Sequence, residues 1–186
     1  MQIIFLDIDG VLVNAVSLRS RSPHEHSNAD PSCVAALNRI VAETGAGIVV
    51  SSSWRIGQEL ADMREVINLH FGVNGNVLGM TPRLTAKKIS AGPRGQLEVS
   101  AERGDEIDCW LRSAHPWPVE SFVILDDEDD MGALKSHLVQ TNFTGGLTMQ
   151  HADRAIEILA TCARPEALSR ERTGQQTIST FGCRKT

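Results

Sequence analysis

The sequence predicts an α/β domain with a Rossmann-like, mostly parallel sheet that helices cover on both faces. Three segments, residues 3–8, 46–50 and 121–125, are apolar nearly throughout, as expected of strands buried on both faces. Segments with helical spacing separate these strands, which gives a β-α-β-α pattern. The length of 186 residues, with 41% hydrophobic and 22% charged residues, fits one ordinary globular domain.

The N-terminal part predicts a strand, a polar loop and a helix. The strand at residues 3–8 ends at acidic residues, and a polar loop follows at residues 14–30. We expect a helix to begin at Pro31, because Asp30 supplies an N-cap and proline suits the first helical position. Gly45 is the expected end of that helix.

The middle of the chain predicts a second strand, a helix and an insertion. The strand at residues 46–50 precedes a helix that runs to about residue 69, with Leu60, Met63 and Ile67 on its apolar face. Residues 71–101 differ in kind, because they are rich in glycine and carry four basic residues against one acid. We expect a basic, irregular insertion there.

The C-terminal part predicts two helices and two strands. A helix over residues 105–113 is expected to be capped by Asp105, and the HPWP sequence ends it before the strand at residues 121–125. A short strand at residues 138–141 precedes a helix that begins after Thr148.

These elements assign residues 1–163 to the domain and residues 164–186 to a polar, basic tail. No membrane span or signal peptide is visible, and neither a membrane nor an obligate protein partner is expected. The four cysteines are Cys33, Cys109, Cys162 and Cys183. They lie far apart without a CxxC pair, which favours reduced cysteines in a cytosolic (cytoplasmic) protein. His24 and His26 are expected on the surface, because two histidines without a third ligand are a weak metal site.

The negative charge of the chain is concentrated in two short stretches. The net charge is −5, but seven of the 23 acidic residues are Asp7, Asp9 and the acids of residues 126–130. The remainder is mildly basic, so a nucleic-acid partner is not excluded. Because ligands bind beyond the carboxyl ends of parallel strands, we expect these acids to meet there.

Clustered carboxylates are tolerated when a divalent cation neutralises them, and an all-oxygen ligand set favours Mg²⁺ over zinc. For residues 126–130 alone, the alternative is a solvated helix N-terminus, where acids are favourable.

Two acids spaced as Asp7 and Asp9 can also take two different roles in phosphoryl transfer. One carboxylate attacks phosphorus, and the other supplies a proton to the departing alkoxide.

The segment FLDIDGVL, from Phe5 to Leu12, resembles the first motif of the haloacid dehalogenase (HAD) superfamily, a hydrophobic strand followed by D-x-D-x-[TV]. The second Asp is found in the phosphatases of that superfamily and not in the dehalogenases. The second motif is a Ser or Thr that binds the phosphoryl group, which implies Ser51 or Ser52 within GIVVSSSWR. The third is a Lys or Arg near a helix N-terminus, a place that Arg103 holds here, although Lys is commoner.

The fourth motif, an acidic pair after an apolar strand, matches FVILDDEDDM. It implies Asp126 as a Mg²⁺ ligand, with Asp127 or Asp130 assisting. The full set of expected metal ligands is Asp7, Asp9, Asp126, Asp127 and Asp130. The segments SSSWR, GMTPR and LDDEDDM are similar to the small HAD-like domain of Swiss Army Knife RNA-repair proteins and its stand-alone bacterial relatives, which are thought to act on nucleic-acid end phosphates.

The resemblance implies a Mg²⁺-dependent phosphatase in which Asp7 attacks phosphorus and Asp9 acts as acid and base. The loop at residues 14–30 stands where the family often has a cap, and it is too short for a large one, so we expect an open site. We expect substrate contacts from Arg83 and Lys87, and from Arg55, for which pairing with the acidic cluster is the alternative. Trp54 is expected to pack rather than to stack on a base.

Phosphorylated ends of RNA or DNA are the first expected substrate, and a small phosphomonoester such as a nucleotide or sugar phosphate is the alternative. A phospho-accepting signalling domain would also combine acids, a hydroxyl and a basic residue around magnesium. In receiver-type domains, however, the acidic pair comes first, whereas here the D-x-D precedes the serines. A non-catalytic binding domain is disfavoured, because all four motif positions carry competent residues.

Overall fold

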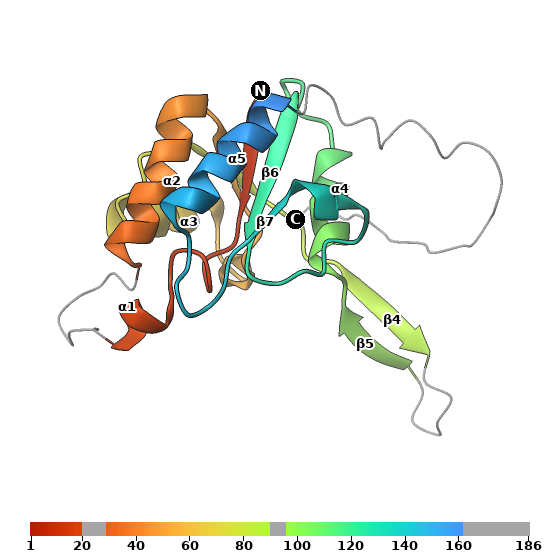
Figure 1. The fold of residues 1–186 in the computed structure, drawn as a ribbon. Coiled ribbons are helices and arrows are strands. Elements are labelled where there is room, and N and C mark those ends of the chain that lie inside the picture. Colours follow the sequence, from red (N-terminus) through yellow and green to blue (C-terminus); the bar gives the residue numbers. More distant parts are fainter. Residues whose placement is uncertain (20–28, 90–95, 162–186) are drawn as a thin grey trace.

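A computed structural model describes residues 1–19, 29–89 and 96–161, and its centre is a five-stranded sheet (Figure 1). Every strand pair in this sheet is parallel. In spatial order the strands are β3 (Val77–Met80), β2 (Gly47–Val50), β1 (Gln2–Leu6), β6 (Ser121–Asp126) and β7 (Leu138–Gln140). The predicted α/β class with a mostly parallel sheet is confirmed.

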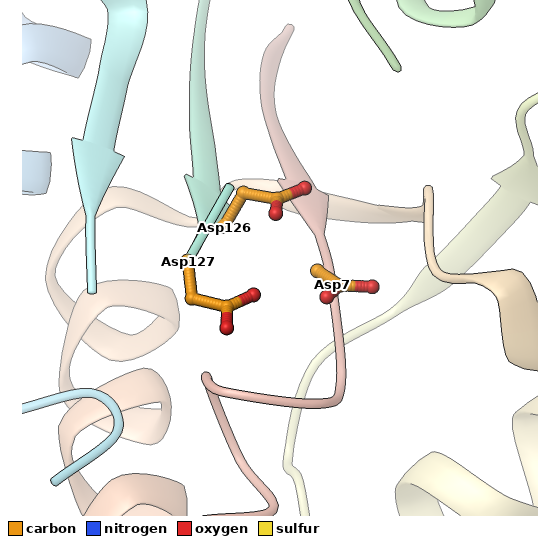
Figure 2. A group of neighbouring side chains, drawn as sticks. All are labelled: Asp7, Asp126 and Asp127. Atoms are coloured by element: carbon orange, nitrogen blue, oxygen red, sulfur yellow. The ribbon is translucent and has the colours of Figure 1, made fainter. Parts of the chain in front are cut away.

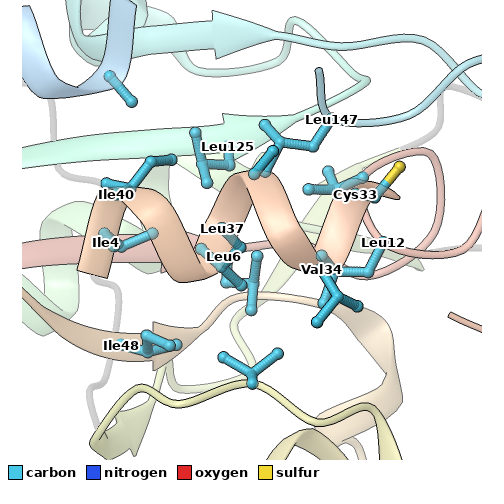
Figure 3. Packing of buried hydrophobic residues seen from close by; sticks show 14 of the residues in the cluster. Ile4, Leu6, Leu12, Cys33, Val34, Leu37, Ile40, Ile48, Leu125 and Leu147 are labelled. Atoms are coloured by element: carbon cyan, nitrogen blue, oxygen red, sulfur yellow. The ribbon is translucent and has the colours of Figure 1, made fainter. Parts of the chain in front are cut away.

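Helices cover both faces of the sheet, because successive residues of each buried strand point to opposite sides. Ile4 and Leu6 of β1 pack beneath α2 (Pro31–Thr44) in one core, which α5 (Met149–Thr161) completes (Figure 3). Ile3 and Phe5 face the opposite core, formed with α4 (Arg103–Leu111). The uninterrupted apolar strands therefore reflect two separate hydrophobic layers, and no large cap domain is present among the described residues.

The predicted ends of α2 and the start of α5 are confirmed. The Asp30 side chain accepts a hydrogen bond from the Ser32 amide at 2.8 Å, and Gly45 ends α2 at a φ of 66°. The Thr148 hydroxyl accepts from the His151 amide at 3.3 Å at the start of α5. The predicted loop after β1 contains the short helix α1 (Ala15–Arg19), whereas His24 and His26 lie outside the described residues.

The helix predicted after β2 is confirmed over residues 60–70, where α3 (Leu60–Arg64) continues directly into the π-helical η2 (Glu65–His70). A separate 3₁₀ turn, η1 (Ser53–Arg55), precedes it. Gly57 has a φ of 78°, which interrupts the helical path between η1 and α3. Met63 and Ile67 are buried as predicted.

The irregular insertion predicted for residues 71–101 is wrong. Val77–Met80 forms β3, which extends the main sheet, and β4 (Thr85–Ile89) pairs with β5 (Gln96–Ser100) in an antiparallel hairpin that projects from the body (Figure 1). Glycine misled the prediction here, because its role is close packing. A Cβ at Gly75 would lie 2.3 Å from the Ile48 side chain.

Helix α4 begins two residues before the predicted start, so Asp105 lies in its first turn and is not its cap. The first amides of α4 are capped by Asp130 instead: its Oδ2 accepts from the Arg103 amide at 3.0 Å, and its carbonyl accepts from Gly104 at 3.1 Å. The sequence could not indicate this cap, because Asp130 follows β6 and reaches α4 only in the folded chain. The 3₁₀ helix η3 (Gly132–His137) follows.

Cys33 is fully buried, as predicted for a core residue, and Cys109 is partly buried on α4. Cys162, Cys183 and the predicted tail at residues 164–186 lie outside the described part of the chain. Within that part, no helix has the length and hydrophobicity to cross a membrane. The cytosolic location stays a prediction.

Candidate active site

Polar side chains follow four neighbouring strands at the carboxyl edge of the sheet. Asp126 ends β6, Asp7 follows β1, Ser51 follows β2 and Thr81 follows β3. The parallel ladder holds them in register, since the Asp7 amide donates to Leu125 O and the Ser51 amide to Leu6 O, each at 2.9 Å. The predicted meeting of acids and serines at one edge is confirmed.

Three carboxylates form the centre of this edge. Asp7, Asp126 and Asp127 each offer an oxygen within 4.8 Å of the others, and Figure 2 shows their side chains side by side at the ends of β1 and β6. Asp126 is fully buried, and its Oδ2 accepts no hydrogen bond from the described residues. An unsatisfied buried carboxylate oxygen within an all-oxygen set fits a hard divalent cation such as Mg²⁺.

The electrostatics of the site also fit a cation. Burial, together with the neighbouring Asp7 carboxylate, raises the pKa of Asp126 to about 7. Burial likewise raises the pKa of Asp7, although Arg103 and a hydrogen bond from Ser52 oppose that rise. The pKa of Asp127 is raised by burial as well. The protein thus holds three carboxylates where their charged forms are unfavourable, and a bound cation would reverse this.

Arg103 supplies the positive side of the site. Its Nη1 donates to Asp7 Oδ1 at 3.2 Å and to the Ser51 carbonyl, and its Nε lies 3.6 Å from Asp126 Oδ2. Burial alone would lower the pKa of Arg103, but the carboxylates of Asp126 and Asp7 raise it overall. The guanidinium therefore stays charged beside the Asp7 carboxylate.

The two serines of the second motif differ in what their hydroxyls do. Ser52 donates to Asp7, and its oxygen accepts from the Trp54 amide at 3.4 Å. Ser51 is fully buried, and its hydroxyl has no hydrogen-bond partner among the described residues. Of the two serines, Ser51 is therefore the one whose hydroxyl has hydrogen-bonding capacity unused by the described residues.

Three of the four motifs thus follow neighbouring strands at one edge of the sheet, and Arg103 of the third motif reaches them from α4. A family model described as the HAD domain in Swiss Army Knife RNA repair proteins matches residues 3–152. The chain belongs to this family. The HAD superfamily is one of phosphatase-type hydrolases, which agrees with the acids, hydroxyl and guanidinium described above. No curated protein matches the chain.

Two of the five expected metal ligands of this HAD domain lie outside the carboxylate group. The Asp9 carboxylate accepts a hydrogen bond from Trp54 Nε1 at 2.8 Å, and Asp130 caps α4. Of the two residues that the fourth motif left open, Asp127 joins the group and Asp130 does not. Gly10 makes room for Asp127, because a Cβ at its φ of 71° would lie 2.3 Å from Asp127 Cγ.

Arg55 corrects another expectation, since its guanidinium is buried and has no donor left for substrate. Its five N–H groups all bind protein acceptors, and its ion pair is with Glu106 rather than with the acidic cluster. The acceptors are the carbonyls of Ser51, Ser52, Thr81 and Pro82 and the Glu106 carboxylate. Arg55 therefore holds the serine loop and the loop after β3 together.

Arg83 is exposed and lines a pocket of about 210 Å³ next to Arg103. No acceptor for Arg83 is found among the described residues, so this guanidinium is available to an anion. Lys87 lies on β4 opposite Glu98 in the backbone register, and its side chain is outside the described part.

The sequence did not single out Thr81 or Glu106, which complete the site. Thr81 is buried at the end of β3, and its hydroxyl has no hydrogen-bond partner in the described part of the chain. Glu106 neutralises Arg55 from α4. The Thr81 position could have been found only by recognising β3 as a strand of the main sheet. The Glu106 position required knowing which face of α4 meets the serine loop.

Proposed function

We propose that this HAD domain hydrolyses phosphomonoesters with Mg²⁺ through an aspartyl-phosphate on Asp7. The observation that carries the proposal is the position of the Asp7 carboxylate, which lies at the strand edge between the Arg103 guanidinium and the acids Asp126 and Asp127. Substrate enters with its phosphoryl oxygens directed at Arg103 and at the Ser51 hydroxyl, which no described residue hydrogen-bonds.

In the first step an Asp7 oxygen forms a bond to phosphorus while the bond from phosphorus to the leaving oxygen breaks. Asp9 gives its proton to that oxygen, so the product leaves as a neutral alcohol. In the second step water attacks phosphorus, Asp9 takes a proton from it, and Asp7 and inorganic phosphate are released. Asp7, Asp126 and Asp127 would hold Mg²⁺, which supplies charge neutralisation at the phosphoryl oxygens when bound.

Phosphorylated ends of RNA or DNA are our preferred substrate. The family is named for RNA repair proteins, the Arg83 guanidinium has no acceptor among the described residues in the pocket beside Arg103, and the β4–β5 hairpin carries Lys87 and Lys88. The backbone phosphates that adjoin the terminal phosphate of such a polymer would use these cations. A small phosphomonoester is the second candidate, because the three-carboxylate centre itself does not select a leaving group.

Phosphate release tests the proposal directly. The substrates are 5′- and 3′-phosphorylated oligonucleotides and a panel of small phosphomonoesters, each assayed with Mg²⁺ or EDTA and with wild type or Asp7→Asn. We expect release that needs Mg²⁺ and is abolished by Asp7→Asn. Activity that survives Asp7→Asn would exclude Asp7 as the nucleophile. If small phosphomonoesters are hydrolysed and phosphorylated oligonucleotides are not, the nucleic-acid substrate is excluded, but the phosphatase activity is not.

A further inference from the structure

We infer that Trp54 is a positioning residue that sets the orientation of the Asp9 carboxylate for proton transfer to the leaving group. The inference rests on the proposed function, in which Asp9 is the acid and base. Its direct observation is the hydrogen bond from Trp54 Nε1 to Asp9 Oδ2 at 2.8 Å. A length of 2.8 Å is that of a well-formed N–H···O hydrogen bond.

The indole is held in place by the loop that carries the motif serines. Its backbone amide donates to Ser52 Oγ, and the buried Arg55 guanidinium binds the carbonyls of Ser51 and Ser52 on the same turn. The ring packs edge-on to Phe71 with a centroid distance of 6.0 Å. The donor that reaches Asp9 is therefore fixed relative to the hydroxyl that would bind the phosphoryl group.

The main chain around Asp9 is also held by hydrogen bonds, so the rotation of the Asp9 side chain is the motion that remains to be restricted. The amides of Leu12 and Val13 donate to Ile8 O at 2.9 Å, and the Gly10 amide donates to Val13 O at 2.7 Å. Trp54 provides the hydrogen bond that the structure gives to the Asp9 carboxylate, and it occupies Oδ2 alone. Asp9 Oδ1 accepts no bond from the described residues and is left to face a leaving group.

The competing orientation is toward the acidic centre. Asp9 lies close enough to Asp127 for their charges to interact, so a divalent cation held by Asp127 would attract the Asp9 carboxylate as well. The indole N–H opposes that rotation, because turning the Asp9 carboxylate toward the acidic centre would break its hydrogen bond with Trp54. Packing alone would not require the indole nitrogen, since phenylalanine keeps an aromatic ring at this position and lacks only the N–H donor and part of the ring volume.

The test compares two leaving groups in Trp54→Phe. p-Nitrophenyl phosphate releases a stable phenolate that needs no proton, whereas a 5′-phosphorylated oligonucleotide releases an alkoxide that does. The ratio kcat/KM covers only the steps up to the first irreversible one, which includes departure of the leaving group. We expect Trp54→Phe to lower kcat/KM about 10- to 100-fold for the alkyl ester and less than about threefold for the aryl ester.

Trp117→Phe is the matched control, because Trp117 is also partly buried but packs on His115, away from the site. It should change neither value. The quotient of the two kcat/KM values from one preparation does not depend on the folded fraction, so the test holds even if Trp54→Phe folds poorly. Equal losses for both esters would overturn the positioning role.

A double-variant comparison checks that Trp54 acts through Asp9. In Asp9→Asn the acid is already lost, so adding Trp54→Phe should lower alkyl-ester turnover by less than about twofold further. A full additional loss would contradict the inference. If the wild-type protein releases no phosphate from either ester, the proposed function fails instead, and the two failures are thereby distinguished.

Discussion

The substitution Glu106→Gln tests whether Arg55 is a structural residue, as its contacts require. Arg55 and Glu106 have exposed side-chain fractions of 5% and 10%, so their ion pair lies almost entirely in the interior. Glutamine keeps the size of the side chain but removes the negative charge. The side-chain NH₂ of the glutamine must also face one of two donors, either the Arg55 guanidinium or the Leu84 amide, where Glu106 offers an acceptor oxygen.

Removing one partner of a buried pair costs about 3 to 5 kcal/mol, and because glutamine retains one acceptor we expect the lower end, about 3 kcal/mol. For a domain of this size that loss lowers the melting temperature by roughly 6 to 12 °C. Urea unfolding of wild type and Glu106→Gln measures the change in the free energy of unfolding.

The control is Glu157→Gln, which breaks an ion pair with Arg154 whose exposed side-chain fractions are 62% and 64%. Exposed pairs contribute little, so this variant should stay within about 1 kcal/mol of wild type. If Glu106→Gln were as stable as Glu157→Gln and instead raised KM, Arg55 would be a substrate ligand after all, and our reading of its contacts would be refuted.

Three further outcomes are expected. Gly10→Ala should displace Asp127 and abolish stabilisation by Mg²⁺ in thermal unfolding, whereas Gly57→Ala, which has a similar φ but open space around it, should retain that stabilisation. Arg83→Ala should raise KM for phosphorylated oligonucleotides by about tenfold and leave p-nitrophenyl phosphate unaffected; an equal effect on both would exclude a role for the pocket in polymer binding. Because the pKa of Asp126 rises from 3.8 to about 7 on folding, the metal-free folded state binds a proton that the unfolded state has lost, so unfolding free energy falls from about pH 4 to pH 7. Denaturation in EDTA should show that fall, Asp126→Asn should weaken it, and a slope of opposite sign would contradict the raised pKa.

The main features of the site could be predicted because they depend on short-range sequence features. Apolar strands that end in Asp7, Ser51 and Asp126 needed only the rule that carboxyl ends of parallel strands share an edge. The N-cap at Asp30 and the stop at Gly45 likewise follow from neighbouring residues. Each of these predictions uses no contact between distant parts of the chain.

The errors concern residues whose partners are distant in sequence. Arg55 looked like a phosphate ligand because it follows the serines, but Glu106, which neutralises it, lies 51 positions away. The fourth motif left Asp130 open as a metal ligand beside Asp127, yet Asp130 caps α4. The strand β3 was missed because its glycine suggested irregular chain, although Gly79 lies beside the Trp110 side chain, whose Nε1 would be 3.5 Å from a Cβ added at Gly79.

The central claim is that Asp7 becomes phosphorylated during turnover. Mixing the protein with substrate and Mg²⁺, quenching in acid within one turnover and analysing the peptides by mass spectrometry tests this most directly. We predict one added phosphoryl group on the peptide that contains Asp7, and none in Asp7→Asn or in EDTA. Turnover in which that peptide never gains a phosphoryl group, together with an active Asp7→Asn, would contradict the account.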